Sequence, residues 1–263
     1  MQRARLPYSE THPLPFGAAC HWTHHGLPLA CLFFQQAAGA HASRLGVGLD
    51  ALLPQGLSWV LSALRVQRLR RVPTPAALTL ETGPTGAASR VAHRDFAGFA
   101  DDDTAACVCG SSRWMMVRTD DGRPVPMPQA VRDLVPEPHP APLVEVPPRL
   151  PEVTAPTAER RFEVRRYDLD INDHANNVRL IEMAVESVPD SLWENGSLLD
   201  LAVIFRTGAV YGEALRAAVA VTRTADGWEA LHALHTADTG RAVLQARSLW
   251  TPSNDSPPPR VQS

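Results

Sequence analysis

The hydrophobic and polar positions along the chain follow the same plan twice. In the first half, the mainly apolar run Leu27–Gly46 has helical composition and ends at a glycine, which suits a helix C-terminus. Four strand-like runs follow it, at Ser58–Leu69, Ala77–Thr82, Ser89–Phe99 and Ala105–Val117. The first half is therefore predicted to be one helix followed by four strands.

The second half repeats this order after an additional strand-like run at Arg160–Asp168. Four apolar residues at helical spacing mark one helix face, and Pro189 stops the helix; they are Val178, Ile181, Val185 and Val188. Strand-like runs come next, at Leu199–Arg206, Ala214–Thr224, Trp228–Thr236 and Ala242–Trp250. The second half is predicted to have the same plan as the first.

The economical packing for each half is an antiparallel sheet wrapped around its helix. Two such sheets side by side form one continuous sheet with both helices on its concave face, an α+β fold with an internal duplication. Residues 124–159 are dense in proline, which removes backbone donors, so they are predicted to be an extended linker. The expected domains are 1–123 and 160–250, and a disordered tail is expected at 251–263.

Composition narrows the classes of function. Hydrophobic residues make up 44% of the 263 residues, charged residues 20%, and the formal net charge is −3, which gives no reason to expect nucleic acid or an anionic membrane as partner. No apolar run is long enough to span a membrane and no signal peptide is recognisable, so a cytoplasmic protein is expected. Cys107 and Cys109 lack zinc-site spacing, so they are predicted to be core residues and no metal is expected.

A cluster of polar residues precedes the second predicted helix. Asp170, Asn172 and His174 stand at alternate positions, and in an extended segment all three would point to one side, toward the helix N-terminus. The alternative is structural, because Asp173 or Asn172 can cap the helix while its neighbours are merely solvated.

Together these residue types fit the hydrolysis of a thioester. A carboxylate can activate water or attack the carbonyl directly, and an imidazole can orient groups or relay a proton. An amide can hold water or substrate, and backbone N–H groups at a helix start can stabilise an oxyanion.

At these residues the sequence resembles the acyl-acyl-carrier-protein (acyl-ACP) thioesterases of bacteria and plant plastids. Their motif D-L-D-x-N-x-H-x-N-N, with a helix ending in E-S-V-P, stands here as Asp168–Pro189. The first half also matches motifs of that family, at Gln35–Gly46, Ser58–Leu61, Arg94–Phe96 and Ser111–Val117.

The resemblance implies two hot-dog units in tandem, each a curved antiparallel sheet around a central helix. It implies hydrolysis of fatty acyl-ACP to free fatty acid and holo-ACP, with acyl carrier protein as partner and no metal or dissociable cofactor. The first half would bind the acyl chain or act as scaffold. The family's catalytic residues carry over to Asp170, Asn172 and His174, and the expected substrate-binding residues are Gln35, Trp59, Asn176 and Asn177.

One departure from the family pattern leaves alternatives open. The family's F-x-K-E-A-x-Y-G-D stretch stands here as Phe205–Glu213, with Gly208 in place of the first acidic residue. Either Asp170 suffices alone, or the protein is slow, altered in substrate or no longer an enzyme. The alternatives are an acyl-CoA thioesterase of the same fold and a non-catalytic acyl-binding protein. The sheet edges can also pair in a homodimer.

Overall fold

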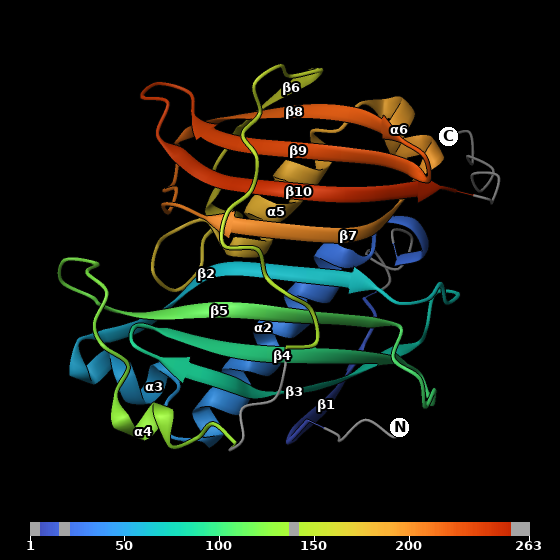
Figure 1. Cartoon of the computed structure of the whole chain (residues 1–263). Coiled ribbons are helices and arrows are strands. Elements are labelled where there is room, and N and C mark those ends of the chain that lie inside the picture. Colours follow the sequence, from blue (N-terminus) through green and yellow to red (C-terminus); the bar gives the residue numbers. More distant parts are fainter. Residues whose placement is uncertain (1–5, 16–21, 137–141, 254–263) are drawn as a thin grey trace.

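A ten-stranded antiparallel sheet runs through the whole chain in the computed structural model, which describes residues 6–15, 22–136 and 142–253 (Figure 1). The strand order is β1-β3-β4-β5-β2-β7-β10-β9-β8-β6. The strands are β1 (Tyr8–Pro13), β2 (Leu57–Arg68), β3 (Ala77–Ala88), β4 (Val91–Ala100), β5 (Val108–Arg118), β6 (Ala158–Glu163), β7 (Gly196–Phe205), β8 (Ala214–Thr224), β9 (Gly227–Thr236) and β10 (Ala242–Pro252).

Two central helices lie on one face of this sheet, α2 (Leu27–Arg44) behind the first half and α5 (Asn177–Glu186) behind the second (Figure 1). They contact each other and the strands, and their buried faces belong to one apolar core that extends through both halves. Shorter helical segments complete the described structure: α3 (Leu49–Leu52), η1 (Leu53–Gln55), α4 (Gln129–Arg132), η2 (Arg166–Asp168) and α6 (Asp190–Asn195).

The two halves meet where β2 pairs with β7. Five residue pairs join these strands, from Ala63 opposite Ile204 to Gln67 opposite Asp200. The Asp200 carboxylate is buried here, and the Arg65 guanidinium donates to it at 2.8 Å. A buried charge is tolerated when it is paired and hydrogen-bonded, so this ion pair lets the junction carry a carboxylate within the sheet.

The proline-rich segment after α4 crosses the face of the sheet opposite the helices (Figure 1). Leu143 N donates to the Asp95 carboxylate at 2.8 Å, and Val144 N donates to Ser111 Oγ at 3.1 Å. Leu150 then packs with Ala63 of the junction strands. The segment is therefore attached to the sheet by specific contacts, as an extended chain crossing a surface.

The predicted α+β duplication is confirmed, and the strand and helix runs found in the sequence correspond to strands and helices of the structure. Several bounds differ from the expectation. β1 was not foreseen, β3 continues past Thr82 to Ala88, and the strand expected at Arg160–Asp168 spans Ala158–Glu163. The segment 124–159, expected to be an extended linker, contains the short helix α4, and β10 continues to Pro252 into the tail that was expected to be disordered. Residues 254–263 of that tail lie outside the described residues.

The cysteines whose placement is described are buried, as expected of core residues. Cys31 and Cys107 are buried free thiols, Cys109 is buried, and Cys20 lies outside the described residues. Across the described ranges, no group of three or more His, Cys, Asp or Glu side chains could hold a metal ion. Within the same ranges no helix is long and apolar enough to cross a membrane.

Candidate active site

The polar loop before α5 is anchored at its base by an ion pair between a buried carboxylate and an exposed arginine. The Asp168 side chain is 1% exposed, and it accepts hydrogen bonds from the backbone N–H and the guanidinium of Arg165, both at 2.8 Å. The Arg165 guanidinium holds the pKa of the Asp168 carboxyl below its usual value. Asp168 O also accepts from Asn176 N at 2.7 Å, so the two ends of the loop are tied together.

Between these ends the chain makes a tight turn. Asp170 N donates to His174 O at 2.7 Å, and Asp173 adopts a left-handed conformation with φ of 57°. Asp170 Oδ1 accepts from the backbone N–H groups of Asn172 at 2.8 Å and His174 at 3.4 Å. The segment is therefore a turn and not the extended strand considered from the sequence. Asp side chains favour such local bonds, and the turn places all three residues along one cavity.

The start of α5 is capped by Asn176, whose Oδ1 accepts from Val178 N at 2.9 Å. Neither Asn172 nor Asp173, the two caps considered from the sequence, has this role. Because Asn176 caps the helix, the side chains of Asn172 and Asp173 are not needed for capping. Asp170 Oδ2 has no hydrogen-bond partner among the described residues, so one carboxylate oxygen is available to a substrate or water.

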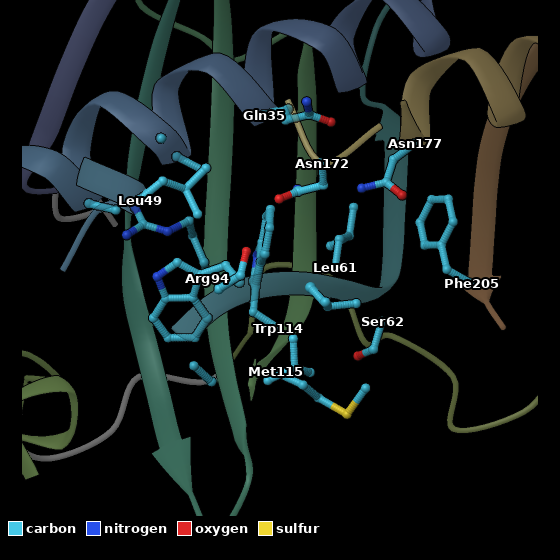
Figure 2. Close-up of a pocket in the computed structure, with 18 of the residues that line it drawn as sticks. Gln35, Leu49, Leu61, Ser62, Arg94, Trp114, Met115, Asn172, Asn177 and Phe205 are labelled. Carbon is cyan, nitrogen blue, oxygen red and sulfur yellow. The ribbon is translucent and has the colours of Figure 1, made fainter. Parts of the chain in front are cut away.

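A cavity of about 880 Å³ opens beside this loop and extends into the first half (Figure 2). The second half contributes the turn, the start of α5 and the end of β7 with the residues that follow it. The first half contributes residues of α2, α3, β2, β3, β4 and β5, together with residues between the end of β5 and Val135. Many first-half lining residues are small, which keeps the interior open: Ala38, Gly39, Ala42, Gly86, Ala87 and Ala92.

The residues predicted for the site all line this one cavity: Asp170, Asn172, His174, Asn176, Asn177, Gln35 and Trp59. Trp59 Nε1 donates to Val47 O at 2.8 Å, which fixes the indole against the wall. Gln35 Oε1 is buried and has no hydrogen-bond partner among the described residues. A buried amide oxygen without a partner is costly, so Gln35 offers an acceptor to whatever fills the cavity.

Gly208 lies directly against the His174 imidazole. A Cβ atom at position 208 would lie 2.3 Å from His174 Cδ2 and 3.0 Å from His174 Cγ. The backbone after Gly208 is paired with the backbone at His174. Ala175 N donates to Ala209 O at 2.7 Å, and His174 forms a β-bridge with Val210. The space that a side chain at position 208 would need is therefore occupied by the imidazole.

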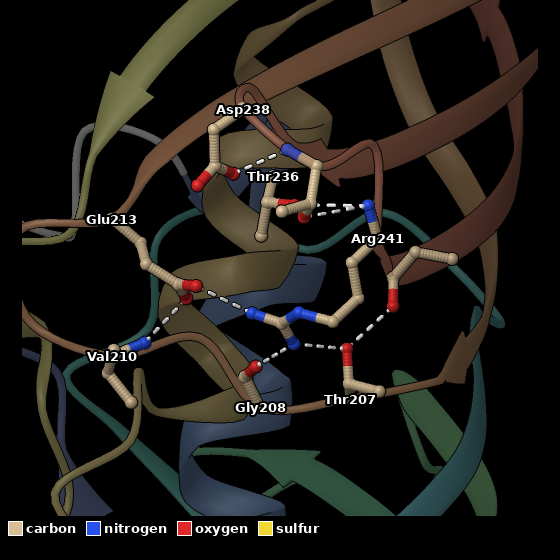
Figure 3. A network of polar contacts seen from close by, with 9 residues as sticks. Thr207, Gly208, Val210, Glu213, Thr236, Asp238 and Arg241 are labelled. Atoms are coloured by element: carbon tan, nitrogen blue, oxygen red, sulfur yellow. Dashed lines mark hydrogen bonds and ion pairs between the residues drawn. The ribbon is translucent and has the colours of Figure 1, made fainter.

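An arginine network that the sequence reading missed holds the backbone at Gly208 (Figure 3). Arg241 donates to Gly208 O at 2.7 Å, to Thr207 Oγ1 at 2.6 Å and to Glu213 Oε1 at 2.7 Å. The other Glu213 oxygen accepts from Val210 N at 2.9 Å. Arg241 follows the turn between β9 and β10, so no local pattern links it to the loop, whereas Glu213 ends the stretch that resembles the family pattern.

Two matches to family models cover most of the chain. Residues 6–135 match the acyl-ACP thioesterase N-terminal domain, and residues 152–252 match the acyl-ACP thioesterase C-terminal domain. The chain is 27% identical over 237 residues to a palmitoyl-acyl carrier protein thioesterase, chloroplastic, of Cuphea hookeriana. That alignment covers 84% of this chain and 56% of the relative, so the chain spans about half the length of the curated relatives it matches.

Solved structures share the fold. The 12:0-ACP thioesterase from Umbellularia californica superposes with a TM-score of 0.78 at 20% identity, covering 94% of this chain and 97% of the other. An acyl-ACP thioesterase from Bacteroides thetaiotaomicron gives 0.76 at 18% identity, covering 92% and 97%. The expected fold of two tandem hot-dog units is confirmed, and with both family models matched in order along the sequence, this chain belongs to the acyl-ACP thioesterase family.

Proposed function

We propose that this chain hydrolyses the thioester between a fatty acyl chain and acyl carrier protein, releasing the free fatty acid and holo-ACP. The observation that carries the proposal is the position of Asp170. One of its oxygens is fixed by the turn and the other is available at the edge of a cavity large enough for an acyl chain. The relatives named as acyl-ACP thioesterases support the choice of substrate.

In this mechanism Asp170 Oδ2 takes a proton from a water molecule, and the oxygen of that water attacks the thioester carbonyl carbon. Backbone N–H groups at the start of α5 stabilise the oxyanion that forms, because the helix dipole and the unpaired donors favour negative charge there. The C–S bond then breaks, and the pantetheine sulfur receives a proton that His174 relays. Asn172 orients the water.

The acyl chain in this proposal extends into the first half, past Trp59. Asn177 and Gln35 hold the polar groups near the thioester, and Asn176 contributes through the helix start that it caps. Gly208 is compatible with this arrangement because one positioned carboxylate is chemically sufficient for general-base catalysis. No step needs a metal or a dissociable cofactor, since the substrate carries its own pantetheine arm.

The test is thiol release from a long-chain acyl-ACP by wild type, Asp170→Asn and Asp173→Asn. Asparagine at position 170 keeps an oxygen for the turn but cannot take a proton, so kcat should fall about 100-fold or more. Asp173→Asn is the matched control, because it removes the same charge from the same turn at a residue that does not line the cavity. It should leave kcat within about twofold of wild type, since surface substitutions are usually mild.

Two results would replace the proposal. Acyl-ACP binding without turnover, unchanged by Asp170→Asn, would identify a non-catalytic acyl-binding protein. A higher kcat/KM for acyl-CoA than for acyl-ACP with the same chain would identify an acyl-CoA thioesterase. The homodimer and the cytoplasmic location expected from the sequence stay predictions, and the plant relatives are named as chloroplast proteins.

A further inference from the structure

A charged side chain forms part of the cavity wall in the first half. Arg94 on β4 lines the cavity among mostly apolar and small residues (Figure 2). Burial lowers the pKa of its guanidinium to about 10, so the group keeps its positive charge at neutral pH. Arginine is rarely buried without a partner of opposite charge, because removing a charge from water is costly.

The protein partners of Arg94 are neutral. Its guanidinium donates to His41 Nδ1 at 3.0 Å and to Thr82 Oγ1 at 3.3 Å. Burial, together with the charges of Arg94 and Arg44, lowers the pKa of His41 to about 4, so the imidazole is an uncharged acceptor. These contacts fix the guanidinium in place but do not neutralise it.

Among the described residues, no carboxylate pairs with Arg94. The neighbouring Asp95 points to the opposite face of the sheet, where it accepts from Leu143 N at 2.8 Å. Within the part of the chain that the structure describes, both hydrogen bonds of the guanidinium are made by one nitrogen, Nη1. The other guanidinium N–H groups are therefore left for a molecule inside the cavity.

Arg94 lies well away from the proposed reaction centre. Its partner His41 follows Gln35 by six residues on α2, which is about 9 Å along the helix axis. Figure 2 shows Arg94 on the Leu49 side of the cavity, whereas Asn172 and Asn177 lie toward the other side. An alkyl chain whose one end is at Asp170 can therefore bring its other end toward the guanidinium.

We propose that Arg94 is a binding site for a carboxylate carried at the end of an alkyl chain. The guanidinium fork matches a carboxylate geometrically, and a charge-assisted pair in a cavity would satisfy donors that the protein leaves unpaired. Two ligands carry this chemistry: an acyl thioester whose far end is a carboxylate, as substrate, and a free fatty acid that enters with its carboxylate first, as inhibitor. The substrate case rests on the proposed function, whereas the binding of a free fatty acid does not.

The experiment compares wild type, Arg94→Met and Arg216→Met in two arms. The first arm measures kcat/KM for acyl-ACP chains of matched length that end in a methyl group or a carboxylate. The second arm measures Kd for free alkyl carboxylic acids and the matching alkyl alcohols by titration calorimetry, which needs no turnover. Arg216 is an exposed arginine paired with Glu159 away from the cavity, so its variant controls for the loss of one positive charge.

The proposal expects wild type to favour the carboxylate in at least one arm, and Arg94→Met to reduce that preference roughly 10- to 100-fold. Arg216→Met should keep it. A preference in the first arm identifies the substrate, and one in the second arm alone identifies the inhibitor. The proposal would be overturned if wild type and Arg94→Met both gave equal kcat/KM values for methyl- and carboxylate-ended chains and equal Kd values for acids and alcohols.

Arg94→Met should fold, because an apolar side chain of similar length replaces a buried charge without a counter-ion. Arg94→Lys provides a second variant in case it does not. Lysine keeps the charge but loses the fork, so it should retain part of the preference. A protein that hydrolyses no thioester but still binds the acids through Arg94 would refute the proposed function and leave this site standing.

Discussion

The two halves of the chain follow one plan but differ where their central helices begin. In the first half α2 begins after Gly26, without a side-chain cap. In the second half α5 begins with Asn176 as cap, behind a turn that presents Asp170. The same position in the fold is therefore a plain helix start in one copy and a polar loop in the other.

The interiors differ as well. The first half is hollow beside the C-terminal part of α2, where alanines and Gly39 line the cavity, while large side chains such as Phe34 and Phe96 fill the rest of its interior. The second half is filled by large side chains such as Ile181, Leu198 and Trp250, each at most 1% exposed. The two halves therefore have different roles within one architecture. The first half encloses most of the cavity, and the second half has a packed core and carries the polar groups of the turn.

Among the substitutions that test the comparison of the two halves, adding one carbon atom to the polar half should have the largest effect. Gly208→Ala places a Cβ against the His174 imidazole, so the ring must move. Because a displacement of about 1 Å in an active site can cost 10²-fold in rate, kcat should fall by up to about 100-fold. The measurement is steady-state thiol release from acyl-ACP.

A double-mutant cycle tests whether this effect acts through the imidazole. In a His174→Ala background the clash disappears, so Gly208→Ala should cost almost nothing more. Additive losses in the two variants would show that Gly208 matters for another reason, and the stated cause would be wrong.

A matched pair of substitutions should sharpen the contrast between the hollow and filled halves. Ala184→Leu on α5 adds volume to a packed core and should destabilise the protein by about 1–3 kcal/mol. Ala38→Leu on α2 adds the same volume beside the cavity, so the loss of stability should be smaller. It should instead shift the preferred acyl chain to a shorter one.

Denaturant unfolding of both variants, with kcat/KM over a series of acyl lengths, checks this pair. If the two substitutions lowered the free energy of unfolding equally and left chain preference unchanged, the interiors would not differ as described.

The smallest effect concerns the ion pair under the polar loop. The folded pKa of Asp168 lies below its ordinary value of 3.8, so the pair stabilises the protein above that pH. This contribution is lost as the pH falls through the folded pKa, when the carboxylate is protonated. Arg165→Met should therefore lower the free energy of unfolding modestly at neutral pH, and the difference from wild type should shrink in acid.

Denaturant unfolding between neutral pH and pH values below that folded pKa measures this difference. Arg161→Met, at an exposed position on β6, is the control and should show no such pH dependence. A deficit of Arg165→Met that stayed constant into acid would show that Asp168 is not the partner that matters.

Periodicity in the sequence predicted the sheet because strands such as β2 and β10 alternate against a buried face, and the two central helices end near Gly46 and Pro189. The halves could be matched for the same reason. β1 was missed because its residues Tyr8–Pro13 are mostly polar, and only pairing with β3 makes them a strand.

The candidate site residues were proposed from their types and from the family motif, but their geometry was not foreseen. Asp170, Asn172 and His174 converge through a turn in which Asp173 has positive φ, and the sequence does not announce that conformation. Arg241 was not identified from the sequence, and Arg94 was noted only as part of a family motif and not as a binding residue, because their partners are far away in sequence. Long-range contacts of this kind depend on the fold and leave no local pattern.

The pairing of β2 with β7 inside one chain has a consequence for symmetry. In a dimer of identical subunits every substitution occurs twice, so hollowing one copy would hollow its mate. In this chain a substitution changes one half and leaves the other unaltered. A cavity in one half and a packed core in the other can therefore occupy equivalent positions of the fold. The chain also keeps its two halves at a fixed local concentration, so the number of complete sites does not depend on dilution.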